Sequence, residues 1–553
     1  MRFIYTLLLL LPFLPVQAQK FELWSLIDES PVRIGSFEEK DLLAQAIRDQ
    51  YINLHQSGYF MPALDTLKEI ETLKVRIKAG DRYRWTRLSM DSIPEWINQE
   101  IIKLIPRAGD YFSQSNVDLL LDRVLEHSQN SGYPFAKTGL HDLKFEDKSI
   151  NASLFYDPGP QIMIDSIDVN HALRLKKRFL YQMLDVEPGS VFSQKKINQI
   201  AHRIEKYKFI RQKGSYDLTF QDQKAIIYLN LINEKVNYID GLAGFMMDQD
   251  QNLVFNGSLE LNLENIFGTG KKIGLFWQNA GGGSQNIDLK YHHPFLLGSP
   301  IHSEMDFTLL KQDSAFLNRK LKIALGLNST HHISYYFSFS HHASQVLNSV
   351  FADSTQENYT AQFYGVTLNW EPPLKEQEFE VSVDVQGGNR DIRRDILDTP
   401  SDQDLPGLQI ITGIESRFMQ PLGKLFYLQT KGKFEKLWSD DYYRNELFRL
   451  GGFRTLRGFT ENYFYAASYG VLSAELGIHI DEQSSLYSFF DQGIMVYQTN
   501  DQKWKTQAHG LGLGFSIQTN NGRFNLVWAA GGTDQQKLNF RQSLLHFGYQ
   551  AKF

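Results

Sequence analysis

From about residue 237 to residue 553, the chain alternates apolar and polar residues in one segment after another. In 379–385, Phe and Val alternate with Glu, Ser and Asp, and in 545–553, apolar residues alternate with His, Gly, Gln and Lys. Successive side chains of a β-strand point to opposite faces, so each segment predicts a strand with one apolar and one polar face. A soluble β-sandwich shows the same alternation, so the pattern alone leaves two architectures open.

Three further features favour a barrel that spans a membrane. The segments run to about ten residues or more, the length of a tilted membrane crossing, and about sixteen of them fit into 237–553. Their polar faces carry charges that suit a water-filled interior: Glu380, Asp384, Lys431 and Lys433. Aromatic residues lie near the predicted strand ends, as in membrane girdles: Trp277, Trp370, Tyr497 and Trp528. We therefore predict an all-β, antiparallel transmembrane barrel of sixteen strands.

The composition agrees with such a barrel and excludes several other classes of protein. Aromatic residues make up 13% of the chain although the mean hydropathy is −0.34, as expected when only one face of each strand is apolar. The formal net charge of −6 argues against a nucleic-acid partner, which usually requires an excess of basic residues. The absence of cysteine excludes disulfides, zinc–cysteine sites, iron–sulfur clusters and thiol nucleophiles.

Residues 1–18 have the features of a secretory signal peptide. Arg2 provides a positive start, 3–16 are almost entirely apolar, and Ala18 is a small residue suited to cleavage. About 14 apolar residues are too few to span a bilayer as a helix. No later stretch is apolar for long enough to be a membrane helix, so the exported protein is either soluble or a membrane β-barrel.

Residues 19–236 have a different periodicity, in which helical stripes alternate with short strands. Apolar residues recur at helical spacing in three segments, which predict helices at about 36–58, 117–132 and 193–207. Ser36 and Glu39 fit a capping box at the start of the first helix. Alternating strands follow the first helix at 73–77 and the third at 227–231.

Short sequences repeat within this region. Residues 57–60, Ser-Gly-Tyr-Phe, are similar to 131–135, Ser-Gly-Tyr-Pro-Phe, and 109–113 are similar to 189–193. A period of roughly 75 to 80 residues indicates repeated small α+β domains rather than a stacked solenoid. We therefore predict three units, over 19–84, 85–161 and 162–236.

The complete layout resembles the BamA/TamA superfamily of outer-membrane assembly and translocation barrels. In that family, α+β POTRA repeats precede a sixteen-stranded barrel, and the repeated Gly-Tyr-Phe after a helix resembles the POTRA pattern. The most specific element is 451–459, Gly-Gly-Phe-Arg-Thr-Leu-Arg-Gly-Phe, which resembles the Arg-Gly-Phe/Tyr signature of the sixth extracellular loop. The tripeptide alone is a weak signal, and its position about a hundred residues before the C-terminus makes the match specific.

In the family, the signature loop folds back into the barrel and its arginine pairs with acids on the inner wall. The resemblance implies this role for Arg457, followed by Gly458 and Phe459. Glu475 lies on the polar side of its predicted strand, and Asp491 lies in Phe-Phe-Asp-Gln-Gly, which resembles the family's Phe-x-Asp-x-Gly strand. A guanidinium inside a barrel needs such acceptors, because its desolvation is otherwise uncompensated. The alternative is a solvated loop residue.

The last strand resembles the family's β-signal, an alternating strand that ends in an aromatic residue and closes the barrel. The residues that carry this resemblance are Phe547, Gly548, Tyr549 and Phe553. A glycine weakens the pairing between the first and last strands and so favours a seam that opens. One glycine in the last strand supports such a seam only weakly.

Two other patterns could be mistaken for ligand sites. Residues 268–272, Gly-Thr-Gly-Lys-Lys, lack the Ser/Thr and the helix of a phosphate loop and predict a tight hairpin turn. The histidine pairs at 292–293, 331–332 and 341–342 cannot chelate a metal on a strand, because adjacent side chains point apart. We interpret them as loop or rim residues. No hydrolase or metalloprotease motif occurs, and we predict no catalytic activity, cofactor or metal site.

The resemblance implies a protein in the lipid bilayer of a Gram-negative outer membrane, with its POTRA domains in the periplasm. These domains would bind client outer-membrane or secreted proteins by strand addition, and the barrel would insert or export the client. Three POTRA units favour the TamA branch, which implies a long periplasm-spanning partner of the TamB type. Two alternatives remain: a two-partner secretion transporter, which would carry an N-terminal plug helix, and a passive outer-membrane channel, which needs neither the inward loop nor the repeats.

Overall fold

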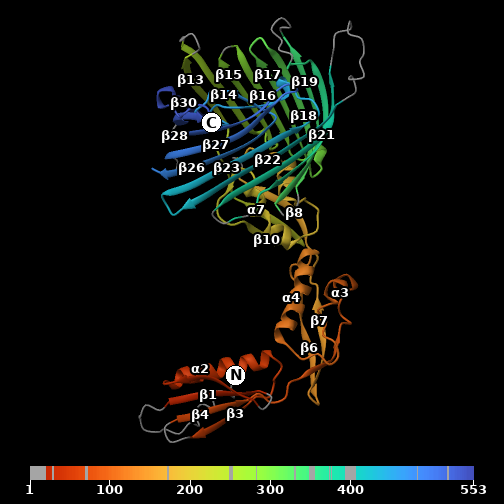
Figure 1. Cartoon of the computed structure of the whole chain (residues 1–553). Coiled ribbons are helices and arrows are strands. Elements are labelled where there is room, and N and C mark those ends of the chain that lie inside the picture. Colours follow the sequence, from red (N-terminus) through yellow and green to blue (C-terminus); the bar gives the residue numbers. More distant parts are fainter. Residues whose placement is uncertain are drawn as a thin grey trace. The chain divides into compact units, whose positions relative to one another are not determined.

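The structure of the chain is a computed structural model (Figure 1). It describes the following residues: 20–27, 30–68, 72–170, 173–247, 253–281, 283–328, 332–347, 355–372, 374, 377–392, 407–481, 484–519 and 522–553. The predicted signal peptide, 1–18, lies outside them. In the part of the chain that the structure describes, no helix is both long enough and apolar enough to cross a bilayer. Residues 169–184, 202–215 and 230–553 form one compact unit, and the remaining residues form a second.

The first α+β segment is a four-stranded sheet with one helix. Its elements are β1 (Lys20–Ile27), β2 (Ser30–Phe37), α2 (Lys40–Gln56), β3 (Ala63–Lys68) and β4 (Thr72–Lys78). The strand order is β2-β1-β4-β3, with β1 and β4 parallel, and Leu23, Leu54 and Ile77 lie in the core. The predicted capping box is wrong. Ser36 belongs to β2, which pairs with β1, and Glu39 makes no side-chain cap, because a hairpin occupies the start of the predicted helix.

The second α+β segment has the order strand, two helices and two strands. Its elements are β5 (Arg84–Ser89), α3 (Glu95–Ile101), α4 (Gln114–Asn130), β6 (Lys137–Glu146) and β7 (Ser149–Asp157). The sheet order is β5-β7-β6, with β5 and β7 parallel and β6 at an edge. The predicted helical stripe, which includes Val117, Leu120 and Val124, packs in one core with Ile150 and Leu154 of β7.

The third α+β segment has the same order with extra short strands. Its elements are β8 (Met163–Val169), α5 (Lys177–Leu184), α6 (Gln194–Asn198), α7 (Ile200–Glu205), β9 (Ile210–Gln212), β10 (Asp217–Gln221), β11 (Lys224–Leu229) and β12 (Leu231–Asn233). The sheet order is β10-β11-β8, and β9 pairs with β12. The helix predicted at 193–207 is divided into α6 and α7. The three segments form a POTRA-like region, whose boundaries at 84, 161 and 236 remain predictions.

The rest of the chain forms a closed antiparallel barrel of sixteen strands, which confirms the predicted fold class (Figure 1). The strands are β13 (Tyr238–Met247), β14 (Leu253–Ile266), β15 (Lys271–Gly281), β16 (Ser284–His293), β17 (Ile301–Gln312), β18 (Phe316–Asn328), β19 (Ile333–Val346), β20 (Tyr359–Trp370), β21 (Glu378–Ile392), β22 (Gly407–Leu422), β23 (Phe426–Trp438), β26 (Ser468–His479), β27 (Ser485–Gln498), β28 (Lys503–Thr519), β29 (Gly522–Thr533) and β30 (Leu544–Lys552). Two connections contain short 3-10 helices, η1 (Leu296–Gly298) and η3 (Phe540–Gln542). β30 pairs with β13 and closes the barrel.

The two faces of the barrel wall differ in the way that the alternation predicts. On β21, Asp384 bonds to Lys322 Nζ of β18 (3.0 Å), whereas the neighbouring Val385 is exposed. Because β18 and β21 are not adjacent, their ion pair lies on the concave inner side. Apolar residues of the outer face are widely exposed, such as Phe337 (64%) and Tyr364 (68%). The wall is therefore polar inside and apolar outside.

Two smaller predictions have opposite outcomes. Residues 267–270 form the turn between β14 and β15, which confirms the predicted hairpin, and Gly268 and Gly270 have positive φ angles of 72° and 70°. The interpretation of the histidine pairs as loop or rim residues is wrong for His341 and His342, which lie within β19. His342 is paired with Lys320 and lines a cavity with it. A polar inner wall accommodates an imidazole there.

Candidate functional site

The chain between β23 and β26 leaves the wall, and we call residues 439–467 the inner loop. It contains η2 (Arg444–Glu446) and a short hairpin of β24 (Phe448–Leu450) and β25 (Phe464–Ala466). Its polar groups bond to residues of β18, β19, β21 and β22 and also to residues of β26 and β27. A segment bonded to separate parts of the wall in this way lies inside the barrel.

We call residues 453–459 the tip of the inner loop. Within the tip, Arg457 contacts three polar side chains of β26 and β27. Its Nε donates to Asp491 Oδ2 (2.7 Å) and its Nη2 to Asp491 Oδ1 (2.5 Å), which makes the pair bidentate. Nη1 donates to Glu475 Oε1 (2.6 Å), and Nη2 also donates to Ser473 Oγ (2.7 Å). The guanidinium lies 3.6 Å from the ring centroid of Phe489. The Arg457 and Asp491 side chains are 8% and 1% exposed, so water hardly screens the pair.

Glycines of β28 and β29 allow the backbone of the tip to lie against the wall. A Cβ at Gly510 would lie 2.0 Å from Arg457 O, and a Cβ at Gly531 would lie 2.5 Å from Gly458 O. Gly458 has a φ of +90°, and a Cβ there would lie 2.6 Å from Ala530 C. A side chain at any of these three glycine positions would prevent this close approach.

The tip also has an apolar side. Leu456 is fully buried and Phe459 is 8% exposed. Both belong to one buried cluster with Tyr469 of β26, Met495 of β27 and Ala508 of β28. The tip is therefore held by apolar burial as well as by the Arg457 contacts.

Two residues just before Arg457 reach the junction between the first and last barrel strands. Arg454 forms an ion pair with Glu260 of β14, and Tyr238 of β13 donates its hydroxyl to the same carboxylate (2.7 Å). The ring of Phe453 lies 5.6 Å from the ring of His546 of β30. The tip thus contacts groups on both sides of this junction.

The junction of β13 and β30, which we call the seam, is a short pairing. Residues 238–244 pair with 546–552, which is half the length of the β27–β28 pairing of 485–498 with 503–516. Gly241, Gly244 and Gly548 lie within the seam. Two of these glycines are in the first strand, so the seam contains more glycine than the last strand alone indicated.

The residues predicted to close the barrel all lie at or next to the seam. Phe547 is 49% exposed on the outer face, and the ring of Tyr549 lies 4.6 Å from that of Phe524 on β29. Phe553 follows β30, and its backbone N–H donates to Asn237 O just before β13 (3.0 Å). The chain terminus is thereby tied to the start of the barrel. A role of these residues as a β-signal stays a prediction.

We call η2 (Arg444–Glu446) the base of the inner loop. The base is bonded to another part of the wall through Asn445, which is fully buried. Asn445 Nδ2 donates to Ser344 Oγ of β19 (2.7 Å) and to Glu357 O (2.7 Å), and its Oδ1 accepts from Glu357 N (3.3 Å). Asn318 Nδ2 of β18 donates to Asn445 O (2.6 Å). The side-chain amide is therefore satisfied by β19 and by the connection before β20, and β18 binds the backbone carbonyl of the same residue.

Glu446 adds a buried ion pair at the base. Arg390 Nη1 of β21 donates to Glu446 Oε2 (2.8 Å), and Gln409 Nε2 of β22 donates to Oε1 (3.2 Å). The Arg390 and Glu446 side chains are only 3% and 4% exposed. Arg390 also lies 4.8 Å from the ring centroid of Tyr443. Removing either charge would leave the other buried without its partner.

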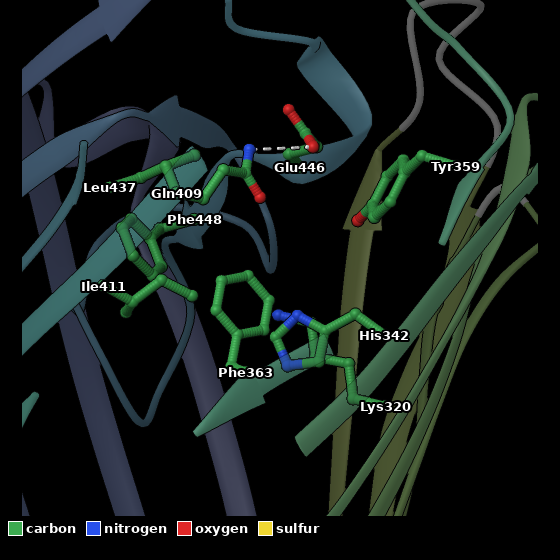
Figure 2. A pocket seen from close by; sticks show the side chains of 9 residues that line it. All are labelled: Lys320, His342, Tyr359, Phe363, Gln409, Ile411, Leu437, Glu446 and Phe448. Carbon is green, nitrogen blue, oxygen red and sulfur yellow. Dashed lines mark hydrogen bonds between the residues drawn. The ribbon is translucent and has the colours of Figure 1, made fainter. Parts of the chain in front are cut away.

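A cavity of about 20 Å³ lies beside Glu446, and Figure 2 shows its lining. The lining residues are Lys320, His342, Tyr359, Phe363, Gln409, Ile411, Leu437, Glu446 and Phe448. Figure 2 shows Gln409 bonded to Glu446 at one side, with Lys320 and His342 at another. This volume suits about one water molecule and is too small for an organic ligand.

The structure places the predicted tip residues together. Arg457, Glu475 and Asp491 are within hydrogen-bond distance, and Gly458 and Phe459 lie beside them in the tip. Their function as a device that holds the loop stays a prediction. Sequence reasoning missed the receiving glycines. Their signal was the run Gly510, Gly512 and Gly514, which puts three glycines on one face of a strand.

Sequence reasoning also missed the base of the loop. Asn445 and Glu446 stand in no motif, and their partners Asn318, Ser344 and Arg390 come from three separate strands. Polar residues are common on the inner face of every strand in such a barrel, so one more of them is no signal. No sequence signal therefore distinguished these residues from their neighbours.

Comparison with protein families gives one match, over part of the chain. Residues 413–517 match the family described as haemolysin secretion/activation protein ShlB/FhaC/HecB. These residues include all of β23, the inner loop, β26 and β27. They therefore include Arg457 and the side chains that it contacts, Ser473, Glu475, Phe489 and Asp491, which we call the Arg457 site. No sequence among the curated proteins matches the chain.

Solved structures share the fold over nearly the whole chain. CdiB from Acinetobacter baumannii has a TM-score of 0.59 at 13% identity, over 93% of this chain and 97% of that chain. CdiB from Escherichia coli has a TM-score of 0.57 at 13% identity, with the same coverage of both chains. BamA from Haemophilus ducreyi lacking POTRA domains 1–3 has a TM-score of 0.44 at 14% identity, over 85% of this chain and all of that chain, which is too low to support an argument.

These identities show the fold and nothing finer. The fold that they share is an α+β region followed by a sixteen-stranded barrel, and the family match covers only residues 413–517 of it. The TamA branch and the count of three POTRA units do not follow from these matches and remain predictions.

Proposed function

We propose that this protein moves polypeptide clients into or across a bacterial outer membrane, with its POTRA-like region in the periplasm. Its first role is the insertion of client outer-membrane proteins at the seam. The inner loop, bound at the Arg457 site, keeps the barrel in a resting state, and client insertion requires release of the tip. The protein's part in this process is mechanical and needs no catalytic group.

The position of the loop tip between the Arg457 site and the seam is the observation that carries this proposal. Arg454 and Phe453 contact β14 and β30, while Arg457, three residues after Arg454, is bonded to β26 and β27. Release of Arg457 would therefore also withdraw contacts from both sides of the seam. Fewer ladder bonds and three glycines make the seam weaker than longer pairings in the same wall.

Client capture would use open sheet edges of the POTRA-like region. β6 is at an edge of its sheet, and most of its residues are exposed. β2 is at an edge of the first sheet and exposes Val32 (49%) and Ile34 (39%). An extended client segment can add to such an edge as a further strand, because the backbone groups on its open side have no partner strand.

Secretion of a partner protein is a second candidate function. The match of 413–517 to a secretion/activation family and the likeness to CdiB both favour it. In this role the client would pass through the barrel instead of leaving it at the seam. In a more specific version of the first role, the protein works with a long periplasm-spanning partner of the TamB type. Only the predicted count of three POTRA units supports this partner.

Deletion of the gene in the source bacterium, followed by quantitative proteomics of the outer membrane and of the growth medium, tests the proposal. Insertion predicts that barrel proteins disappear from the outer membrane while the medium is unchanged. Secretion predicts the loss of a protein from the medium alone. Complementation with the wild-type gene should restore both fractions, and complementation with Arg457→Ala should not. If deletion changes neither fraction, the proposal is wrong and the passive channel is favoured.

A further inference from the structure

The third α+β segment contains a basic stretch that the proposed function does not use. Val169–Leu184 carries no acidic residue and four strongly basic ones: Arg174, Lys176, Lys177 and Arg178. All four side chains are exposed, and among the described residues none of them forms an ion pair. An exposed cluster of cations without acidic partners indicates a surface that attracts anions.

Hydrogen bonds hold this stretch against two connections of the barrel, within one compact unit. Lys176 N donates to Gly268 O in the β14–β15 turn (2.8 Å), and Asn265 Nδ2 at the end of β14 donates to Arg174 O (3.1 Å). Further along α5, Gln182 Nε2 donates to a carbonyl oxygen of η1 in the β16–β17 connection (3.0 Å). The basic side chains therefore lie at the end of the barrel where these connections lie.

The same two connections expose large apolar side chains. Phe267 in the β14–β15 turn is 84% exposed, and Leu297 in η1 is 93% exposed. Both residues have a φ of 53°, a left-handed conformation that is strained for bulky side chains. Water stabilises neither the exposed apolar groups nor the strained backbone. An apolar environment around these side chains would explain why the connections present them.

The neighbouring wall indicates what this environment is. The strands that the two connections join carry exposed apolar residues on their outer face, such as Leu259 of β14, Trp277 of β15 and Leu289 of β16. In a membrane barrel this face contacts lipid, so connections at its end lie at the boundary between hydrocarbon and headgroups. Clustered Lys and Arg beside exposed apolar side chains are typical of surfaces that bind anionic lipid, because the apolar groups enter this boundary and the cations meet phosphates.

We propose that the exposed side chains of Phe267 and Leu297 and of four neighbouring basic residues form a binding surface for anionic phospholipids in the membrane leaflet next to these connections; the basic residues are Arg174, Lys176, Lys177 and Arg178. The surface holds α5 at the membrane, close to the strands that follow the seam. The proposal does not depend on whether the barrel inserts or secretes its client. An acidic segment of a partner protein is the rival occupant, and the experiment separates the two.

The absence of cysteine allows a test on the full-length protein with one label. Leu297→Cys, labelled with an environment-sensitive fluorophore, is reconstituted into nanodiscs of phosphatidylcholine or of phosphatidylcholine with phosphatidylglycerol. A headgroup spin-labelled lipid serves as quencher. We expect quenching in both lipids, and about twofold more with phosphatidylglycerol, because anionic headgroups attract the basic stretch. High salt should abolish the difference, because it screens charges at the membrane surface.

Charge-reversal variants provide the controls. Lys176→Glu with Lys177→Glu should remove the phosphatidylglycerol effect, and Lys176→Gln with Lys177→Gln should reduce it. Lys195→Glu with Lys196→Glu, the same charge change on exposed residues of α6, should keep it. All variants should retain the heat resistance of the wild-type barrel on gels. Equal quenching in both lipids, or an effect that survives Lys176→Glu with Lys177→Glu, would overturn the proposal. Capture of an acidic protein through these lysines without any lipid effect would also overturn it.

Discussion

The tip and the base of the inner loop are both buried and both bonded to the barrel wall, but they differ in how the bonds are shared. The polar contacts of the tip with β26 and β27 depend on Arg457, whose single guanidinium contacts Asp491, Glu475 and Ser473. The base spreads its contacts over Asn445 and Glu446 and several wall strands. A site that depends on one side chain can be released in one step, whereas a distributed site cannot. The tip is therefore the part suited to move, and the base is suited to remain attached.

Arg457→Ala should have the largest effect, because it leaves two buried carboxylates without their cation. We expect a loss of about 3–5 kcal/mol of stability, together with loss of client handling. The measurement is the temperature at which the purified barrel unfolds, seen on gels as the loss of the faster-migrating folded form. Arg457→Lys serves as control. Its transition temperature should lie between those of the wild type and of Arg457→Ala, because an amine keeps the charge but cannot form the bidentate pair. An unchanged transition temperature and normal client levels would contradict the role of the tip.

Glu446→Ala should have the next largest effect, because it leaves the buried Arg390 with only the more distant and exposed carboxylate of Asp441 (3.9 Å). We expect a loss of about 3 kcal/mol of stability, measured by the same transition on gels. The combination with Arg457→Ala tests whether tip and base are separate. The two sites share no partner residue, so their effects should add within about 0.5 kcal/mol. A double variant that loses clearly less than the sum would show that tip and base act as one unit.

The difference between tip and base also explains what the sequence could and could not predict. Arg457, Gly458 and Phe459 are consecutive, and Asp491 and Glu475 stand in short recognisable patterns. A motif of adjacent residues is readable without any structure. The base is assembled from residues that are far apart in sequence, such as Asn318, Arg390 and Asn445, and only the closed barrel brings them together.

The same physical reason accounts for the outcomes in the fold. Alternation with a period of two is a local property, so the sixteen strands were predictable. The start of the first helix was not, because Ser36 and Glu39 fit a local cap while pairing of β2 with β1 decided the structure. His342 was misplaced because β19 extends to Val346, so that this residue lies within the wall and not at its rim.

Gly510→Ala should disturb the tip and leave the base intact. Its Cβ would lie 2.0 Å from Arg457 O, so the tip must shift, at an expected cost of about 1–3 kcal/mol. Gly387→Ala is the matched control, because a Cβ at this strand position meets no atom within 4 Å. Heat resistance on gels measures both. If the two variants behave alike, the glycines of β28 are not what allows the tip to approach the wall.

Arg454→Ala should have the smallest effect on stability and a local effect on the seam. The side chains of Arg454 and Glu260 are 50% and 31% exposed, so solvent screens their ion pair and its loss should cost only about 0.2–1 kcal/mol. The pair nevertheless joins the tip to β14 next to the seam. Hydrogen exchange should therefore accelerate in 238–244 and stay unchanged in 485–498, the long pairing that serves as internal control. A loss of stability as large as that of Arg457→Ala would show that the tip is distributed in the same way as the base.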